Sequence, residues 1–174
     1  MKKYVKWIIF VAGVACLTLL DQITKVLAQS KLMGQDAIPI IKDVFELRYL
    51  ENRGAAFGIL QGRAVPLLIF TVILAAGIAW LYGRTPEDRK HRVFRYSLIF
   101  LFAGAIGNMI DRFMNQYVID FLYFKLIDFP IFNVADCYVT CSVVVIAWIY
   151  LFVFKEEEDL AFMQLKKKKE DQDE

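Results

Sequence analysis

The stretch that decides the fold is "CYVTCSVVVIAWIYLFVF", Cys137–Phe154, which is apolar over almost its whole length. A helix needs about 20 such residues to cross roughly 30 Å of hydrocarbon, and this run approaches that length. The residues before it, "FNVAD" at Phe132–Asp136, place an asparagine and an aspartate at its start. Because an ionised Asp costs about 2.5–3.5 kcal/mol at the centre of a membrane helix, a carboxyl group kept here indicates a function.

Three further apolar runs of about 18–21 residues precede this one, and each is long enough to span a bilayer. The chain has 174 residues, of which 58% are hydrophobic and 15% aromatic, which is too apolar for a soluble domain of that size. The predicted spans lie at about 7–27, 65–82, 93–113 and 134–154. We therefore expect an α-helical integral membrane protein with four transmembrane helices, in which residues 1–154 form a single domain.

The basic residues indicate how the spans are oriented. They gather before span one, between spans two and three, and after span four, at Lys2, Lys3, Lys6, Arg84, Arg89, Lys90, Arg92, Arg95 and Lys155. By the positive-inside rule, both termini and the middle loop face the cytoplasm. The connections at about 28–64 and 114–133 then face outward. Residues 155–174, which include "KKKK" at 166–169, are predicted to form a charged cytoplasmic tail.

The first outward connection contains the segment "VFELRY", which alternates between apolar and charged residues. Phe45, Leu47 and Tyr49 fall on one face, and Glu46 and Arg48 fall on the other. This period is typical of a half-buried strand. We expect a small extracytoplasmic β-sheet that lies on the membrane surface.

Several kinds of catalytic site are excluded by the residues that the chain lacks. His91 is the only histidine, so a histidine triad, a zinc protease helix and a haem site are all ruled out. No serine has a basic partner at a recognisable spacing, which leaves only a serine–lysine pair assembled by folding. Cys16, Cys137 and Cys141 fall in predicted spans, where we interpret them as small buried hydrophobic residues. We expect neither a metal nor a cofactor.

Two polar pairs stand near the outward ends of spans one and two. Asp21 and Lys25 are four residues apart, so they share one face of a helix and are placed to form an ion pair. Asn52 and Gly54 begin the stretch "NRGAAFGI", just before span two. Turn geometry alone would also explain an asparagine and a glycine there.

Small and polar residues recur at helical spacing near the outward end of span three, in "AGAIGNMIDRF" at 103–113: Gly104, Gly107, Asn108 and Asp111. This spacing places them on one face of the helix, where the glycines favour close packing of another helix, either within the protein or from a substrate. Arg112, next to Asp111, is able to hold a carboxylate through two hydrogen bonds.

Two more acids, Asp120 in "YVIDF" and Asp136 in "FNVAD", have apolar neighbours on the same outward side of the membrane. Asn133 would suffice as the N-cap of span four, so Asp136 is not needed for that purpose. If folding brings these two carboxyl groups to within about 3–5 Å of each other, they do not both ionise, and one of them keeps a proton. The pair is therefore suited to acid–base chemistry.

In this order, and at this depth in the membrane, the motifs "NRGAAFG", "GNMIDR", "VIDF" and "FNVAD" resemble the lipoprotein signal peptidase family, also called signal peptidase II. The resemblance implies a membrane-embedded aspartic endopeptidase. Such an enzyme removes the signal peptide from diacylglyceryl-modified bacterial prolipoproteins and cleaves just before the lipidated cysteine. The resemblance also implies that Asp120 and Asp136 are the catalytic dyad. The residues that would support the dyad or contact substrate are Asp21, Lys25, Asn52, Gly54, Asn108, Asp111, Arg112 and Asn133.

The resemblance also implies partners and a location. The partners are prolipoprotein substrates and membrane lipid, without nucleic acid, and the enzyme is a monomer. It would be a multi-pass protein of the bacterial cytoplasmic (inner) membrane, with its active site at the outer face. Because no acyl-enzyme forms, serine and cysteine reagents are not expected to inactivate it.

Two other functions are left open by the residues alone. A small transporter or proton-conducting protein would use the four acids as a relay, at Asp21, Asp111, Asp120 and Asp136. Against it, these acids gather toward one face of the membrane and do not step across it. A purely structural membrane scaffold leaves the acids unexplained.

Overall fold

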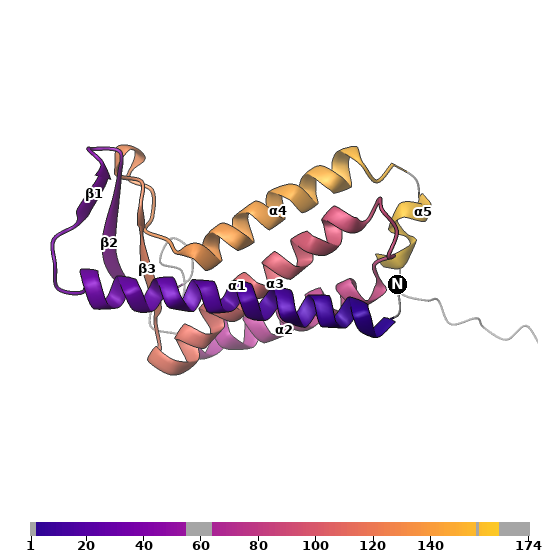
Figure 1. The fold of residues 1–174 in the computed structure, drawn as a ribbon, viewed down its shortest axis with the longest axis horizontal. Helices are drawn as coiled ribbons and strands as arrows, with labels where there is room; N and C mark the ends of the chain where they lie inside the picture. Colours follow the sequence, from indigo (N-terminus) through magenta and orange to yellow (C-terminus); the bar gives the residue numbers. More distant parts are fainter. Residues whose placement is uncertain (1–2, 55–63, 156, 164–174) are drawn as a thin grey trace, which may run out of the picture.

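A computed structural model of the chain describes residues 3–54, 64–155 and 157–163 (Figure 1). Among these residues, four helices are long and apolar enough to cross a membrane. They are α1 (Lys3–Leu32), α2 (Ala64–Arg84), α3 (Arg92–Asn115) and α4 (Val134–Phe152). The four predicted spans are thereby confirmed as helices. α1 is longer than its predicted span because the helix continues into the polar residues at both ends of the apolar run.

The described strands form one antiparallel sheet in the order β1 (Ile38–Ile41), β2 (Phe45–Asn52) and β3 (Val118–Tyr123). The sheet stands at one end of the long helices, and the start of α1 and the short helix α5 lie at the other end (Figure 1). β2 begins at Phe45 and includes most of the predicted strand. Glu46 and Arg48 were expected on a polar face of this strand. Glu46 is nevertheless only 8% exposed, and its carboxylate lies 3.5 Å from the Lys125 ammonium group.

Helix α3 packs against each of the other three long helices. Near the α5 end, its buried residues Phe94 and Leu98 join a cluster with Phe10 and Tyr82. At the opposite end, a second cluster brings β3 against α1 through Ala28, Leu32, Ile119 and Phe121. This second cluster fixes the position of Asp120, which lies between Ile119 and Phe121 on β3.

Two glycines of α3 explain how closely α4 approaches it. A Cβ atom on Gly104 would lie 2.6 Å from the Ala135 carbonyl oxygen, and one on Gly107 would lie 2.5 Å from Asp21 Oδ2. The glycine face is therefore covered by α4 and α1. It serves packing within the protein and is not open to a substrate helix.

After α4, the chain turns back as α5 (Glu157–Leu160) and the 3₁₀ helix η3 (Ala161–Met163). Phe162 is 8% exposed and packs with Phe94 and Phe154, and its carbonyl oxygen accepts a hydrogen bond from Arg84 Nε at 2.7 Å. The predicted tail thus begins with a packed segment, because it carries an aromatic residue that the sequence argument overlooked. Residues 164–174, including the four lysines at 166–169, lie outside the described residues.

Candidate active site

The first turn of α4 holds Asp136 in a fixed position. Asn133 is the N-cap, and its Oδ1 accepts a hydrogen bond from the Asp136 backbone N–H at 3.0 Å. In return, Asp136 Oδ2 accepts from the Asn133 backbone N–H at 3.1 Å. This reciprocal capping box satisfies two backbone donors of the helix end. The predicted N-cap role of Asn133 is confirmed, and Asp136 takes part in the cap as well.

Asp120 projects from β3, and two carboxamide groups hold it. Asn133 Nδ2 donates to Asp120 Oδ1 at 2.6 Å, and Asn52 Nδ2 donates to Asp120 Oδ2 at 2.9 Å. The β2–β3 pairing brings Asn52, at the end of β2, beside the start of β3. The Gly54 backbone N–H donates to Asn52 Oδ1 at 3.0 Å, so the amide nitrogen of Asn52 is turned toward the carboxyl group.

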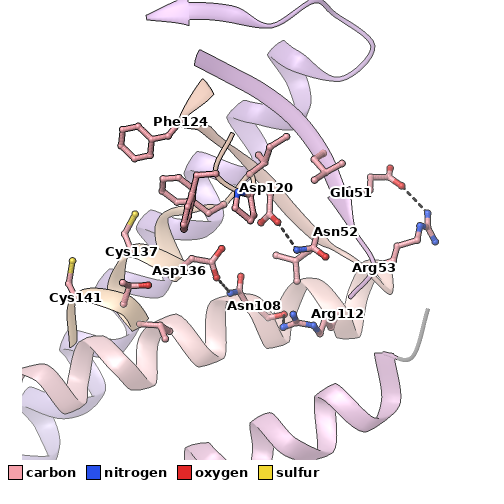
Figure 2. A pocket seen from close by; sticks show the side chains of 18 residues that line it. Glu51, Asn52, Arg53, Asn108, Arg112, Asp120, Phe124, Asp136, Cys137 and Cys141 are labelled. Carbon is pink, nitrogen blue, oxygen red and sulfur yellow. Dashed lines mark hydrogen bonds and ion pairs between the residues drawn. The ribbon is translucent and has the colours of Figure 1, made fainter. Parts of the chain in front are cut away.

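Asp120 and Asp136 line the same cavity, whose volume is about 860 Å³. Figure 2 shows the two side chains reaching toward one space, Asp120 from β3 and Asp136 from α4. Part of the cavity wall is polar and includes Asn52, Asn108 and Arg112. The rest is largely apolar, with residues from the loop before α4 and from the first turns of that helix: Phe124, Phe129, Pro130, Ile131, Phe132 and Val139.

The environment of Asp120 makes its carboxyl group a weak acid. The residue is 1% exposed. Burial, together with the charge of Asp136, raises the pKa of Asp120 to about 7, although the N–H groups of Asn52 and Asn133 act in the opposite direction. Both protonation states of Asp120 are therefore accessible near neutral pH.

Asn108 connects Asp136 to the interior of the protein. Its Nδ2 donates to Asp136 Oδ1 at 2.8 Å. Its Oδ1 accepts from Asn133 Nδ2 at 3.1 Å and from Lys25 Nζ at 2.9 Å. Asn108 and Asn133 together thus link both carboxyl groups into one hydrogen-bond network.

Beneath this network lies a buried ionic cluster. Lys25 Nζ is 2.9 Å from Asp21 Oδ2 and 3.0 Å from Asp111 Oδ2, and the lysine side chain is 1% exposed. Asp21 Oδ1 also accepts from the Ala135 backbone N–H at 2.9 Å, and Asp111 Oδ2 accepts from the Ile119 N–H at 3.1 Å. The predicted Asp21–Lys25 ion pair is confirmed. The cluster joins α1 and α3 to the starts of α4 and β3, the elements that carry the two aspartates.

Gln22 belongs to the same cluster and was missed in the sequence. Its Nε2 donates to Asp21 Oδ2 at 3.2 Å, to Asp111 Oδ1 at 3.0 Å and to the Gly107 carbonyl oxygen at 3.2 Å. The sequence feature that points to Gln22 is a polar amide next to Asp21 within an apolar span.

Arg112 lines the cavity, but its hydrogen bonds differ from those expected. It donates to the carbonyl oxygens of Asn108 at 3.4 Å and Gly54 at 3.3 Å. The neighbouring carboxylate of Asp111 is held by Lys25 instead, because it points toward α1. Gly54 itself is buried, and the part of the "NRGAAFGI" stretch that follows it, residues 55–59, lies outside the described residues.

Two cysteines also line the cavity, which corrects their interpretation as buried hydrophobic residues. Cys137 is half-buried and Cys141 is exposed, and both belong to the face of α4 that borders the cavity. In the part of the chain that the structure describes, no group of three His, Cys, Asp or Glu side chains is placed to hold a metal ion.

Comparison with known proteins places this arrangement in a family. Residues 13–152 match the family model described as signal peptidase (SPase) II. A lipoprotein signal peptidase of Caldanaerobacter subterraneus is 41% identical over 143 residues, which are 82% of this chain and 94% of the relative. A lipoprotein signal peptidase of Brevibacillus brevis is 42% identical over 137 residues, which are 79% of this chain and 89% of the relative.

Solved structures agree with the sequence comparisons. A bacterial membrane enzyme determined by the in meso method at 2.3 Å resolution has a TM-score of 0.71 and 28% identity, with 91% of this chain and 93% of that chain covered. A second such enzyme, at 1.9 Å, has a TM-score of 0.72 and 29% identity, with 84% and 94% covered. The fold, the sequence match and the order of the motifs together show that this chain belongs to the signal peptidase II family.

Proposed function

We propose that this chain is a membrane-embedded aspartic endopeptidase that removes the signal peptide from diacylglyceryl-modified bacterial prolipoproteins, just before the lipidated cysteine. One observation carries the proposal. Asp120 and Asp136, from two different elements, face one cavity and are joined through the carboxamides of Asn108 and Asn133. Family membership supports the choice of substrate.

The chemistry is peptide hydrolysis by a dyad that shares one proton. The ionised aspartate takes a proton from a water molecule as the water oxygen bonds to the scissile carbonyl carbon. The protonated aspartate gives its proton to the carbonyl oxygen, which produces a tetrahedral diol. As the C–N bond breaks, one aspartate protonates the leaving nitrogen and the other recovers a proton from the diol, so the dyad returns to its starting state. No covalent bond to the enzyme forms.

The surrounding residues are proposed to support this dyad. Asn52, Asn108 and Asn133 hold the carboxyl groups through their N–H donors. The buried cluster of Asp21, Lys25 and Asp111 fixes the elements that carry the dyad. Arg112 and Gly54 are proposed to contact the substrate, because Arg112 lines the cavity and bonds to the Gly54 carbonyl oxygen.

The cavity suits a substrate that arrives through the membrane. A signal peptide is an apolar helix, and one part of the cavity wall is made of aromatic and aliphatic side chains on and before α4. Asp120 lies on β3 and Asp136 in the first turn of α4, and the sheet that contains β3 stands at one end of the long helices (Figure 1). We propose that this end is the outer face of the cytoplasmic membrane, that both termini and the tail from residue 155 are cytoplasmic, and that the enzyme is a monomer whose single domain comprises residues 1–154.

The first test is cleavage of a diacylglyceryl-modified prolipoprotein by the purified chain in detergent, followed by gel shift. We expect Asp120→Asn and Asp136→Asn each to lower kcat by at least about 10³-fold, since the acid or the base is lost. Asp36→Asn makes the same chemical change at an exposed position and serves as the control. Normal turnover by either dyad variant would contradict the mechanism.

A further inference from the structure

The side-chain amide of Asn108 has one orientation that its neighbours permit. Lys25 Nζ and Asn133 Nδ2, which are both donors, lie 2.9 and 3.1 Å from one end of the amide. Only the carbonyl oxygen accepts hydrogen bonds from them, and an NH₂ group at that end would face two donors. The NH₂ group must therefore face Asp136 Oδ1, at 2.8 Å.

The other contacts of Asp136 also suit a negative charge. Its second oxygen accepts from the Asn133 backbone N–H, at the positive end of the α4 dipole. The charged groups that act on it from the neighbouring elements include the cations Lys25 of α1 and Arg112 of α3, and Asp120 of β3, with which Asp136 shares its proton. Lys25 is itself paired with the carboxylates of Asp21 and Asp111, and Asp21 also accepts from the Ala135 N–H beside Asp136.

Asp120 is placed differently. It lies on a strand, and its side-chain donors are the neutral amides of Asn52 and of Asn133, the N-cap of α4, whereas Asp136 also accepts from a backbone N–H at that helix end. Burial and the nearby charge of Asp136 raise the pKa of Asp120 to about 7, so Asp120 is able to hold a proton at neutral pH. Because desolvation acts on both carboxyl groups, the distinction between them rests on their hydrogen-bond donors.

We infer that Lys25, acting through Asn108, is a positioning residue that keeps Asp136 ionised, so that Asp136 is the general base and Asp120 is the general acid. This inference rests on the proposed function and assigns the two roles that it leaves open. Lys25 carries a full charge, and its contact with the Asn108 oxygen polarises the amide, which makes the opposite N–H a stronger donor to Asp136.

The reaction then has a defined proton path. Asp136 takes the proton from the attacking water while Asp120 gives its proton to the carbonyl oxygen. In the second half, Asp136 passes that proton to the leaving nitrogen as the C–N bond breaks. Asp120 recovers a proton from the diol as the new carboxyl group forms. One water is consumed, and each aspartate returns to its initial state.

The pH dependence of kcat/KM tests the assignment. Its acid limb reports protonation of the base, and its alkaline limb reports loss of the proton from the acid. Asn108→Leu removes the donor to Asp136 at similar volume, so the acid limb should move to higher pH by about one unit, the usual effect of a hydrogen bond to a charged group. The double variant Lys25→Met/Asp111→Asn keeps the net charge of the cluster, and Asp111→Asn alone is its reference. Relative to that reference, the double variant should move the acid limb to higher pH by less than Asn108→Leu does.

Two further variants separate positioning from structure. Gln22→Leu disturbs the same ionic cluster without touching Asn108, so it should leave both limbs in place. Asn52→Leu removes a donor to Asp120, so it should move the alkaline limb to higher pH and leave the acid limb unchanged.

The outcomes are distinct. A reversed pattern, in which Asn52→Leu moves the acid limb and Asn108→Leu the alkaline limb, would make Asp120 the base and overturn the assignment. If the acid limb of the kcat/KM profile stays in place in Asn108→Leu or in the Lys25 double variant, these residues are structural only. Both results need an active enzyme, so they differ from failure of the proposed function, in which the folded wild type cuts no prolipoprotein at any pH.

Discussion

At the scale of single residues, the proposed dyad places a titrating carboxyl group inside the protein. The pKa of Asp120 is about 7 in the folded chain, whereas an aspartate in an unfolded chain titrates near pH 4. The folded state therefore binds this proton more tightly. The contribution of Asp120 to stability is fully present below the unfolded pKa and is lost as the pH rises toward 7, because ionisation of a buried group opposes folding.

We expect the apparent Tm of the purified chain to fall between about pH 5 and pH 7. Asp120 lowers the free energy of unfolding there by up to about 1.4 kcal/mol per pH unit. Asp120→Asn should flatten that slope, whatever its effect on Tm at a single pH. Thermal unfolding across the pH range measures this, with Asp36→Asn as the reference. An unchanged slope in Asp120→Asn would mean that Asp120 does not titrate in this window.

Cys137 and Cys141 give a second prediction at this scale. No thiol takes part in the proposed chemistry, so by that mechanism alone cysteine reagents would leave the enzyme active. Both thiols nevertheless line the cavity, so an added group would occupy the space needed by substrate. We expect N-ethylmaleimide to slow prolipoprotein cleavage at least several-fold by blocking that space, and Cys137→Ala/Cys141→Ala to be resistant.

Cys16 serves as the internal control for this experiment, because it lies on α1 outside the lining of the cavity. Mass spectrometry reports which thiols carry the label. Full activity of a chain labelled at Cys137 or Cys141 would show that the substrate does not use this part of the cavity.

At the scale of elements, the site depends on how closely α3, α4 and α1 pack. Gly107→Ala would bring a methyl group against Asp21 Oδ2 and Ala135 Cβ, so the carboxylate or the start of α4 has to move. We expect a loss of about 1–3 kcal/mol in stability, together with reduced activity, because Asp136 shifts with α4. Thermal unfolding and cleavage assays measure the two effects.

Gly77→Ala is the matched control for this change. A Cβ atom there has no neighbour within 4 Å, and alanine favours a helix over glycine by about 0.5–1 kcal/mol. It should therefore hold or raise the Tm. If Gly107→Ala and Gly77→Ala have the same Tm and the same cleavage activity, the close approach at Gly107 does not constrain α4.

The sequence predicted the elements better than their mutual placement. The four spans, β2, the N-cap and the Asp21–Lys25 pair all follow from local spacing, which sequence shows directly. The role of Gln22, the burial of Glu46 and the cavity position of the cysteines depend on which face of each element meets a distant one. Local periodicity does not carry that information.

At the scale of the whole molecule, the sheet with β3, which carries Asp120 of the proposed dyad, and the short C-terminal helix α5 lie at opposite ends of the long helices (Figure 1). Phe162 closes the aromatic cluster at the far end, where it packs with Phe94, Phe154 and His91. Truncation of such a buried phenylalanine usually costs about 3–5 kcal/mol. The dyad shares no contact with this cluster, so its chemistry should be insensitive to the change.

We therefore expect Phe162→Ala to lower the apparent Tm by several degrees while kcat and KM at low temperature stay within about twofold of wild type. Unfolding and cleavage measured on the same sample test both parts. A large loss of turnover in a fully folded sample would reveal coupling between the two ends of the molecule.

The buried ionic cluster has a consequence for the order in which the protein is made. Asp21 and Lys25 lie on the same helix, so α1 carries its own counter-ion when it enters the bilayer, before any later span has been synthesised. Asp111 arrives with α3, and the ammonium group that it needs is already in place. Lys25 is thus never an isolated cation within the hydrocarbon, because the apolar part of the first helix, residues 7–27, carries one lysine and one aspartate that pair with each other.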